Sequence, residues 1–321
     1  MTGLVLGAYA AAPRWAEVDD ATWSEWYTRL RGEPLVGGLE IAWDRDLFAG
    51  GAERLAAVLD PRWSSVVTMM AGVSARMVDD SRYGLASDHA DSRRLAVADV
   101  VAAHGEIMRL RDALGPEAVR AIEVQSALSA IAAAASARAF GESLREILDL
   151  DWQGVAVVVE HCDGADGVLP QKAFLSLGIE VGCLDGAAST SAGRPLVGHA
   201  VNWARSVIET RSPDGAEEAI SHLAERQLLA GLMFSGVSPV ATVFGREWAD
   251  SHLPVADGAS GSEPASLLTA ERVGRALKLA GEGLHYLGAK VSAPKTPGLT
   301  LAARLAPGLA TLRVIAEAAA G

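Results

Sequence analysis

The chain has 321 residues and a formal net charge of −12, from 28 basic and 40 acidic side chains. Half of the residues are hydrophobic, which is enough for a large core, and one α/β barrel of this length is ordinary. Nucleic acids and anionic membranes bind basic surfaces, so the acidic balance argues against both as partners. Two cysteines, Cys162 and Cys183, are too few for a disulfide framework. Because we see neither a basic, apolar leader nor an uncharged apolar run of about 18 residues, we expect a cytoplasmic protein without a membrane span.

Eight strands and eight helices are expected to alternate along the chain. Short apolar runs predict strands over residues 4–9, 35–43, 65–70, 119–125, 154–160, 197–203, 231–235 and 286–292. Amphipathic or alanine-rich segments predict helices over residues 22–31, 52–59, 91–114, 129–150, 170–177, 214–229, 267–282 and 300–319. Long loops are expected after the third, fifth and seventh strands, at residues 71–90, 182–196 and 237–265.

This alternation indicates a closed barrel. Alternating strands and helices require parallel crossover connections, and eight such units are the number that closes a barrel. A doubly wound open sheet is the competing architecture. It is disfavoured because no Gly-x-Gly-x-x-Gly motif follows the first strand, and because such sheets usually have about five or six strands. We therefore predict a single (β/α)8 TIM barrel over residues 1–321.

The strand at 154–160 is the centre of the predicted site. It carries no charge until Glu160, which His161 and Asp163 follow directly. Ligands of α/β proteins bind at this end of the strands, so Glu160 is the leading catalytic candidate; a solvated carboxylate at the strand edge is the alternative. Side chains alternate between the faces of a strand, so His161 points away from Glu160 and could be catalytic or packed beneath a helix. Asp163 could equally cap a loop or a helix.

Three other charged residues inside predicted strands are candidates for the site. Glu40 and Glu123 stand in the middle of apolar runs, where a carboxylate is costly unless it is paired with a cation or faces a polar pocket. Lys290 is the lone charge of the last strand. It could neutralise one of these carboxylates, contact a substrate anion or take part in proton transfer.

Further side chains near the strand ends are candidates for substrate binding. Together with Glu40 and Asp163 they are Tyr9, Trp43, Gln125, Asn202, Trp203, Arg205 and Ser235. Asn202 could donate hydrogen bonds or form a turn, and Arg205 could bind an anion or form an exposed ion pair. Trp43 and Trp203 are expected to form apolar walls for a sugar ring.

Several motifs carry a resemblance to a known family. They are Gly-Leu-Glu-Ile at 38–41, Glu-His-Cys-Asp at 160–163, Asn-Trp-x-Arg-Ser at 202–206 and Phe-Ser-Gly at 234–236. The chain resembles an uncharacterised, mostly bacterial family within the xylose isomerase-like TIM-barrel superfamily, from residues 6–10 to residues 286–290. The resemblance implies an enzyme that isomerises or epimerises sugars or polyols. It also implies a divalent metal held by acids and a histidine at the ends of strands five to eight, and a carboxylate base beside a carbonyl.

The residues depart from the ligand set that the resemblance implies. Glu160 matches a ligand position, whereas Asn202, Ser235 and Lys290 stand where an acid, a histidine and an acid are implied. A cation in the fourth position is electrostatically incompatible with the usual metal. We therefore expect no metal or other cofactor, with a divalent metal as the less favoured option. Gln125-Ser-Ala-Leu128 also stands where related sequences have His-Ser-Ala-Pro, which indicates altered chemistry.

These observations predict an isomerase or epimerase that acts by proton abstraction and return on a small, polar, sugar-like carbonyl or polyol substrate. Glu160 is the expected base, with Glu123 or His161 as a second acid/base group. Lys290 and Asn202 are expected to stabilise the developing enolate charge. This mechanism requires the Glu160 and Lys290 side chains to lie within a few Å of each other.

Three alternatives remain open from the sequence. The barrel could be a lyase with related chemistry, or it could bind a ligand without turnover. A metal enzyme with an unconventional ligand set of Glu160, His199 and Asp163 is a weaker alternative. A homodimer is possible, although no hydrophobic stripe in the sequence identifies an interface.

Overall fold

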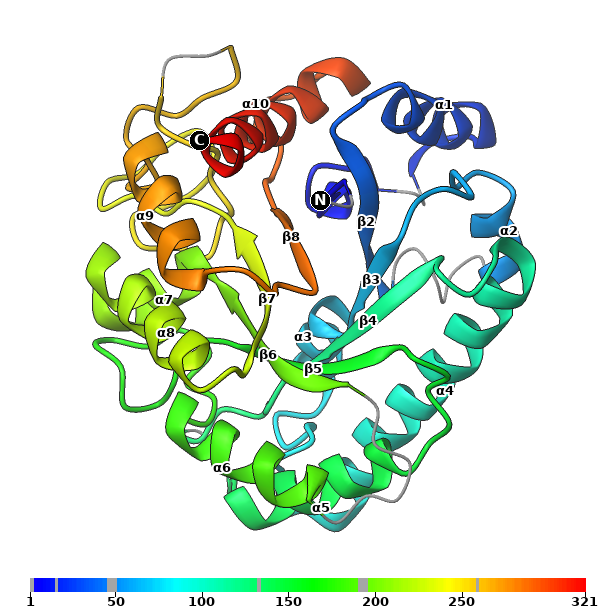
Figure 1. Cartoon of the computed structure of the whole chain (residues 1–321), viewed down its shortest axis with the longest axis vertical. Coiled ribbons are helices and arrows are strands. Elements are labelled where there is room, and N and C mark those ends of the chain that lie inside the picture. Colours follow the sequence, from blue (N-terminus) through cyan, green and yellow to red (C-terminus); the bar gives the residue numbers. More distant parts are fainter. Residues whose placement is uncertain (1–2, 15–16, 45–50, 132–133, 190–195, 258–259) are drawn as a thin grey trace.

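The computed structural model describes residues 3–14, 17–44, 51–131, 134–189, 196–257 and 260–321. Within them, eight parallel strands close into a barrel in chain order, and helices surround it (Figure 1). The strands are β1 (Leu4–Leu6), β2 (Val36–Ala42), β3 (Ser65–Thr68), β4 (Val119–Val124), β5 (Ala156–His161), β6 (Val197–Asn202), β7 (Leu229–Phe234) and β8 (Tyr286–Ala289). β1 pairs with both β2 and β8, which closes the barrel. The predicted (β/α)8 fold is confirmed.

Among the described residues, ten α-helices are present where eight were predicted, and they follow the strands in the expected alternation. They are α1 (Asp20–Arg31), α2 (Gly51–Ala56), α3 (Met70–Asp79), α4 (Ala90–Leu114), α5 (Ala137–Leu148), α6 (Leu177–Ala188), α7 (Trp203–Thr210), α8 (Pro213–Glu225), α9 (Ala270–Ala280) and α10 (Leu301–Ala320). A short 3-10 helix, η1 (Ala8–Ala10), follows β1 and carries Tyr9, which the sequence placed in the strand. No helix among the described residues is long and apolar enough to cross a membrane.

Several predicted segments were wrong in whole or in part. Helix α3 occupies much of the predicted loop at 71–90, and α7 begins directly at the last residue of the predicted strand 197–203. The predicted helix at 170–177 is irregular, and α6 forms where the loop at 182–196 was expected to begin. Helix α6 contains three glycines, each of which lowers helix propensity by about 1 kcal/mol relative to alanine, so its sequence resembles that of a loop. Tertiary packing of its buried apolar side chains outweighs that cost.

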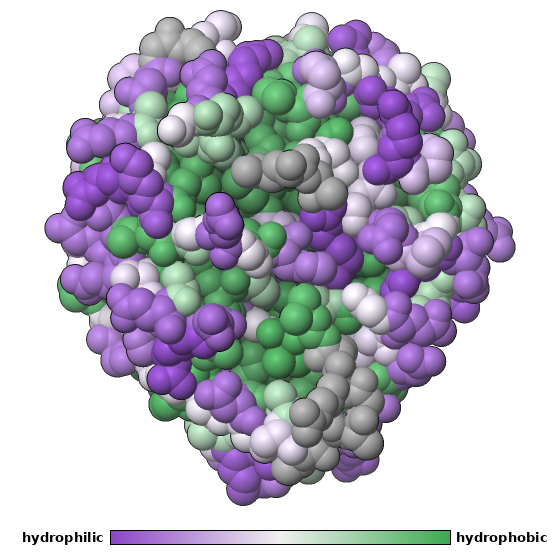
Figure 2. All heavy atoms as spheres, in the orientation of Figure 1, coloured by the Kyte–Doolittle hydropathy of each residue, from purple (hydrophilic) through white to green (hydrophobic). Residues whose placement is uncertain are grey.

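The inner face of the barrel determines which side chains meet at the site. Alternate residues of each strand face the barrel axis. A separate hydrophobic cluster fills the interior with Val5, Val66, Ala121, Ala156, Val158, Ala200, Ala230, Met233 and Tyr286. The same alternation turns Glu123, two residues after Ala121, and Glu160, two residues after Val158, toward the axis. The larger core lies between the strands and the helices, beneath an outer surface on which hydrophilic side chains occupy much of the periphery (Figure 2).

Candidate active site

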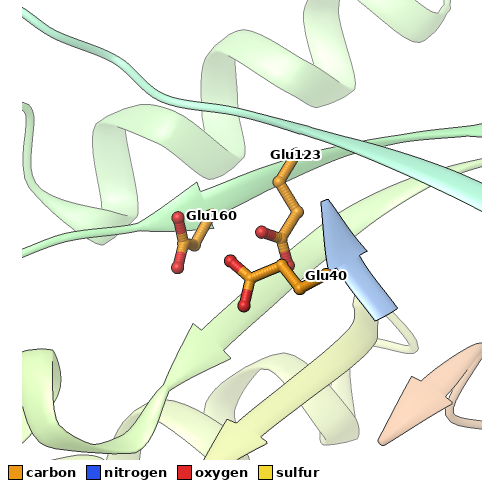
Figure 3. A group of neighbouring side chains, drawn as sticks. All are labelled: Glu40, Glu123 and Glu160. Atoms are coloured by element: carbon orange, nitrogen blue, oxygen red, sulfur yellow. The ribbon is translucent and has the colours of Figure 1, made fainter. Parts of the chain in front are cut away.

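Three glutamates from three strands point toward one another inside the barrel (Figure 3). They are Glu40 of β2, Glu123 of β4 and Glu160 of β5, and each is 0–1% exposed. One carboxylate oxygen of each lies within 4.8 Å of the others. Buried carboxylates at such separations repel one another, so the group needs bound protons or cations. We call these three residues the glutamate cluster.

Lys290 supplies a cation to this cluster. It directly follows β8, is completely buried, and its Nζ lies 2.5 Å from Glu40 Oε1 and 3.4 Å from Glu160 Oε1. Burial alone disfavours the charged amine, but Glu160 and Glu40 raise the pKa of Lys290 well above its usual value. The predicted proximity of Glu160 and Lys290 is therefore present, and the ammonium bridges two strands across the barrel.

Glu160 is held as a fixed anion by three neighbours. Arg205 Nη1 lies 2.6 Å from Oε1, which Lys290 also contacts, and Gln125 Nε2 donates a 2.8 Å hydrogen bond to Oε2. Burial opposes ionisation, but the charges of Arg205 and Lys290, with these hydrogen bonds, lower the pKa of Glu160 to about 2. A carboxylate with so low a pKa is a weak proton acceptor at neutral pH.

Arg205 links the cluster to a further, largely buried carboxylate that sequence reasoning missed. Its Nε lies 3.1 Å from Asp250 Oδ2, and Lys172 Nζ also pairs with that oxygen. Lys172 and Arg205 help to lower the pKa of Asp250 well below its usual value although burial opposes this. His252 Nδ1 lies 3.3 Å from Asp250 Oδ1, and burial lowers the pKa of His252 to about 3, so this imidazole is neutral.

We assign the proton of the glutamate cluster to Glu123. Burial, and then the charges of Glu160 and Glu40, raise the pKa of Glu123 well above its usual value. The phenol of Tyr286 donates a 2.7 Å hydrogen bond to Glu123 Oε1, while Oε2 has no partner among the described side chains. Tyr286 reaches this position over Gly231, where a Cβ would lie 2.1 Å from the phenol ring. Sequence reasoning treated Tyr286 as an ordinary strand residue.

Glu40 has one paired oxygen and one free oxygen. Oε1 contacts Lys290 and accepts a 3.5 Å hydrogen bond from the Tyr9 hydroxyl, whereas Oε2 is buried without a partner in the described structure. Burial raises the pKa of Glu40, and Lys290 partly offsets this shift. Gly7 leaves room for the free oxygen, because a Cβ there would lie 2.7 Å from Oε2.

The other predicted substrate contacts divide between the inner face and the outer core. Asn202 and Ser235 are buried side by side, with the Ser235 hydroxyl donating a 2.7 Å hydrogen bond to Asn202 Oδ1. Trp43 and Trp203 belong to the hydrophobic core around the barrel and are 6% and 0% exposed. Asp163 Oδ2 accepts the backbone N–H groups of residues 171 and 172, which is the loop-capping alternative.

The sequence matches a model of a known protein family over most of its length. A model of a domain of unknown function (DUF4862) matches residues 5–306. The chain belongs to this family. An uncharacterized protein of Salmonella typhimurium (strain LT2) is 29% identical over 295 residues, which cover 90% of this chain and 89% of that protein.

Solved structures share the fold of this DUF4862 chain at low sequence identity. A putative xylose isomerase from Rhodospirillum rubrum has a TM-score of 0.63 and 11% identity over 99% of both chains. An L-ribulose 3-epimerase has a TM-score of 0.55 and 14% identity over 100% of this chain and 99% of its own. A D-psicose 3-epimerase, crystallised in the presence of D-fructose, has a TM-score of 0.57 and 10% identity over 100% of both chains. These likenesses show the TIM-barrel fold.

His161 lies on the opposite side of β5 from the glutamate cluster. Its Nδ1 is 2.6 Å from Glu180 Oε2 of α6, and its Nε2 is 3.0 Å from Glu209 Oε2 of α7. This contradicts a catalytic role for His161 beside Glu160, because successive residues of a strand face opposite ways. Helix α7 also carries Arg205, one turn before Glu209, so it contacts both consecutive residues of β5.

The glutamate cluster does not fit the divalent metal that the fold family implies. Its three carboxylates are close enough to share an ion, but the Lys290 ammonium already lies against two of them and Arg205 against Glu160. A metal there would face two adjacent cations. His199 does not supply the missing ligand, since it neighbours the inward-facing Ala200 on β6 and so faces the helices.

We expect metal analysis of the purified protein to agree with this charge pattern. Plasma mass spectrometry should find Mn, Zn, Co and Mg well below one equivalent, and a chelator should leave the melting temperature unchanged. The Lys290→Met variant is the matched comparison, because removing the ammonium leaves the three carboxylates free to bind an ion. One equivalent of metal in the wild-type protein, with a lower melting temperature after chelation, would show that Lys290 moves away to admit the ion.

Proposed function

We propose that this DUF4862 barrel is an isomerase or epimerase that moves a proton at the carbon next to a carbonyl in a small sugar-like or polyol substrate. The arrangement of Glu40, Glu123 and Lys290 carries the proposal. A carboxylate and a neutral carboxylic acid, each with one unpaired oxygen, lie beside a buried ammonium. Two titratable groups whose surroundings separate their pKa values are the usual basis of acid/base catalysis.

The proposed epimerisation uses each of these groups once. Glu40 Oε2 removes the proton from the carbon beside the carbonyl, and the electron pair of the broken C–H bond moves to the carbonyl oxygen as an enolate. An N–H of Lys290 stabilises that oxygen. Glu123 then gives its own proton to the opposite face of the carbon, the enolate returns to a carbonyl, and proton exchange restores Glu40 and Glu123. The shielded position of the cluster keeps water from competing for the enolate.

Glu160 has a different role in this proposal from the one that the sequence suggested. Both of its oxygens are occupied by Arg205, Lys290 and Gln125, so it is poorly placed to accept a substrate proton. We assign it to positioning the Lys290 ammonium, and we assign the base to Glu40.

Solvent deuterium exchange tests the proposal without knowledge of the product. The protein is incubated in D2O with a panel of ketoses, uronates and keto-glycosides, and proton NMR follows the signal of each C–H beside a carbonyl. We expect loss of this signal for at least one compound, and we expect Glu40→Gln, which removes the proposed base, to slow that loss by about 10²–10⁴-fold. The control is Glu146→Gln, which alters a half-exposed carboxylate on α5. Exchange at the wild-type rate in Glu40→Gln would refute the base role of Glu40.

A barrel that binds a ligand without turnover is the second candidate. The observation that favours it is the internal pairing of the site, in which Ser235 and Asn202 bond to each other and Glu160 is fully paired. A panel compound that binds while none of its C–H signals exchanges would support this candidate. Elimination of a substituent in place of return of the proton would indicate a lyase.

A further inference from the structure

The charges around the glutamate cluster balance within the protein. Lys290 contacts Glu40 and Glu160, Arg205 contacts Glu160 and Asp250, and Lys172 pairs with Asp250. Glu123 is neutral because burial and the neighbouring carboxylates raise its pKa well above its usual value. The three cations Lys290, Arg205 and Lys172 therefore face the three carboxylates Glu40, Glu160 and Asp250, and the formal charges sum to zero.

Four polar atoms on the inner face are left without hydrogen-bond partners in the described residues. They are Glu40 Oε2, Glu123 Oε2, Gln125 Oε1 and Asn202 Nδ2, and each belongs to a side chain that is at most 1% exposed. A buried polar atom without a partner has lost its hydrogen bonds to water, so a ligand that bonds to these atoms gains affinity. Glu40 and Gln125 offer acceptors, while Asn202 and the protonated Glu123 offer donors. Hydroxyl groups match this mixture, because each hydroxyl both donates and accepts.

We infer that the site takes an electrically neutral, polyhydroxylated carbonyl compound and rejects sugars that carry a phosphate or a carboxylate. This inference rests on the proposed function and specifies its substrate class. A phosphate entering the cluster would have to displace Glu40 or Glu160 from Lys290, or Asp250 from Arg205. Displacing Glu40 leaves a buried carboxylate without its cation, and each of the other two displacements removes one of the two cations that neutralise Glu160 or Asp250. A neutral polyol keeps every ion pair and satisfies the four unpaired atoms.

Binding to matched pairs of compounds tests this inference. The pairs are D-fructose with D-fructose 6-phosphate, D-glucose with D-glucuronate, and myo-inositol with its 1-phosphate, all at equal ionic strength. Melting temperature and titration calorimetry report binding to the full-length protein. We expect at least one neutral compound to raise the melting temperature at millimolar concentration and to bind at least 10-fold more tightly than its charged partner. Asn202→Ala should weaken that binding while the ion pairs stay intact, and Ser221→Ala on α8 should leave it unchanged.

Two results would overturn the inference. One is tighter binding of a charged compound than of its neutral partner, and the other is the absence of a melting-temperature shift with every neutral compound. These results are distinct from failure of the proposed function. A neutral ligand that binds without deuterium exchange contradicts the enzyme and leaves the ligand class intact. Exchange in a phosphorylated or carboxylated compound supports the enzyme and refutes the ligand class.

Discussion

Replacement of Lys290 by methionine is expected to lower the free energy of unfolding by about 3–5 kcal/mol, as for other buried ion pairs that lose one partner. Methionine retains the unbranched length of the side chain, so little packing is lost. What disappears is the ammonium that lies 2.5 Å from Glu40 and 3.4 Å from Glu160. Glu160 keeps Arg205, so Glu40 bears most of the loss. Denaturant unfolding measures the change directly.

The pH dependence of the same variant separates lost charge from lost packing. Without Lys290, burial and Glu160 raise the pKa of Glu40 with less opposition than before. A raised pKa in the folded state means that the folded protein binds more protons than the unfolded chain, so the variant becomes more stable as the pH falls. We therefore expect a smaller stability deficit at pH 5 than at pH 8. Lys290→Met combined with Glu40→Gln should recover at least about 1 kcal/mol. A deficit that is equal at both pH values would assign the loss to packing.

The charged strand residues could be predicted because they interrupt apolar runs. Glu40 and Lys290 are each the only charge of their predicted strand. Glu123 follows two apolar residues in a strand that also contains Arg120, and a buried charge requires a partner. The period of two then separates Glu160 from His161. From these rules the sequence identifies strands that contribute to the site, and it gives the pairing of Lys290 with a carboxylate as one of three possible roles.

The partners that reach the cluster from loops and helices could not be predicted in this way. Asp250 lies in a long irregular segment after β7, and Lys172 lies where a helix was wrongly expected, so no periodic pattern placed either one. Tyr286 reads as an apolar strand residue, and its hydroxyl meets Glu123 because a glycine on the neighbouring strand β7 gives its ring room. Such contacts depend on three-dimensional packing rather than on local sequence.

His161 belongs to a buried cluster of charged residues, which could not be predicted because two of the helices were missed. Its partners Glu180 and Glu209 lie on α6 and α7, one of which was misplaced and the other overlooked. Burial opposes protonation, but these two carboxylates raise the pKa of His161 to about 10. The cluster is therefore a buried imidazolium between two carboxylates. The nearby His199, on the neighbouring strand β6, has no partner for either ring nitrogen among the described residues, and burial lowers its pKa to about 3.

His161→Gln is expected to cost about 3–5 kcal/mol of unfolding free energy near pH 6, because it leaves Glu180 and Glu209 without their cation. The pKa of His161 is raised from 6.5 to about 10 on folding, so its contribution is fully present below pH 6.5 and is lost as the pH rises toward 10. The stability difference between the wild type and His161→Gln should therefore shrink across that interval. The matched control, His199→Leu, removes an unpaired neutral imidazole and should change stability little at any of these pH values.

Nitrogen NMR of the imidazole rings measures the two protonation states independently of stability. We expect His161 to show the spectrum of an imidazolium at pH 8, and His199 that of a neutral ring at the same pH. A neutral His161 at pH 8 would mean that no ion pair forms between the His161 ring and Glu209. Helix α7 would then be attached to β5 chiefly through the Arg205–Glu160 pair, at 2.6 Å. In that case His161→Gln should cost no more than His199→Leu. A protonated His161 at pH 8 means that α7 forms ion pairs at both faces of β5, through Glu209 with His161 and through Arg205 with Glu160. The pair at one face then helps to keep Arg205 oriented toward the glutamate cluster at the other.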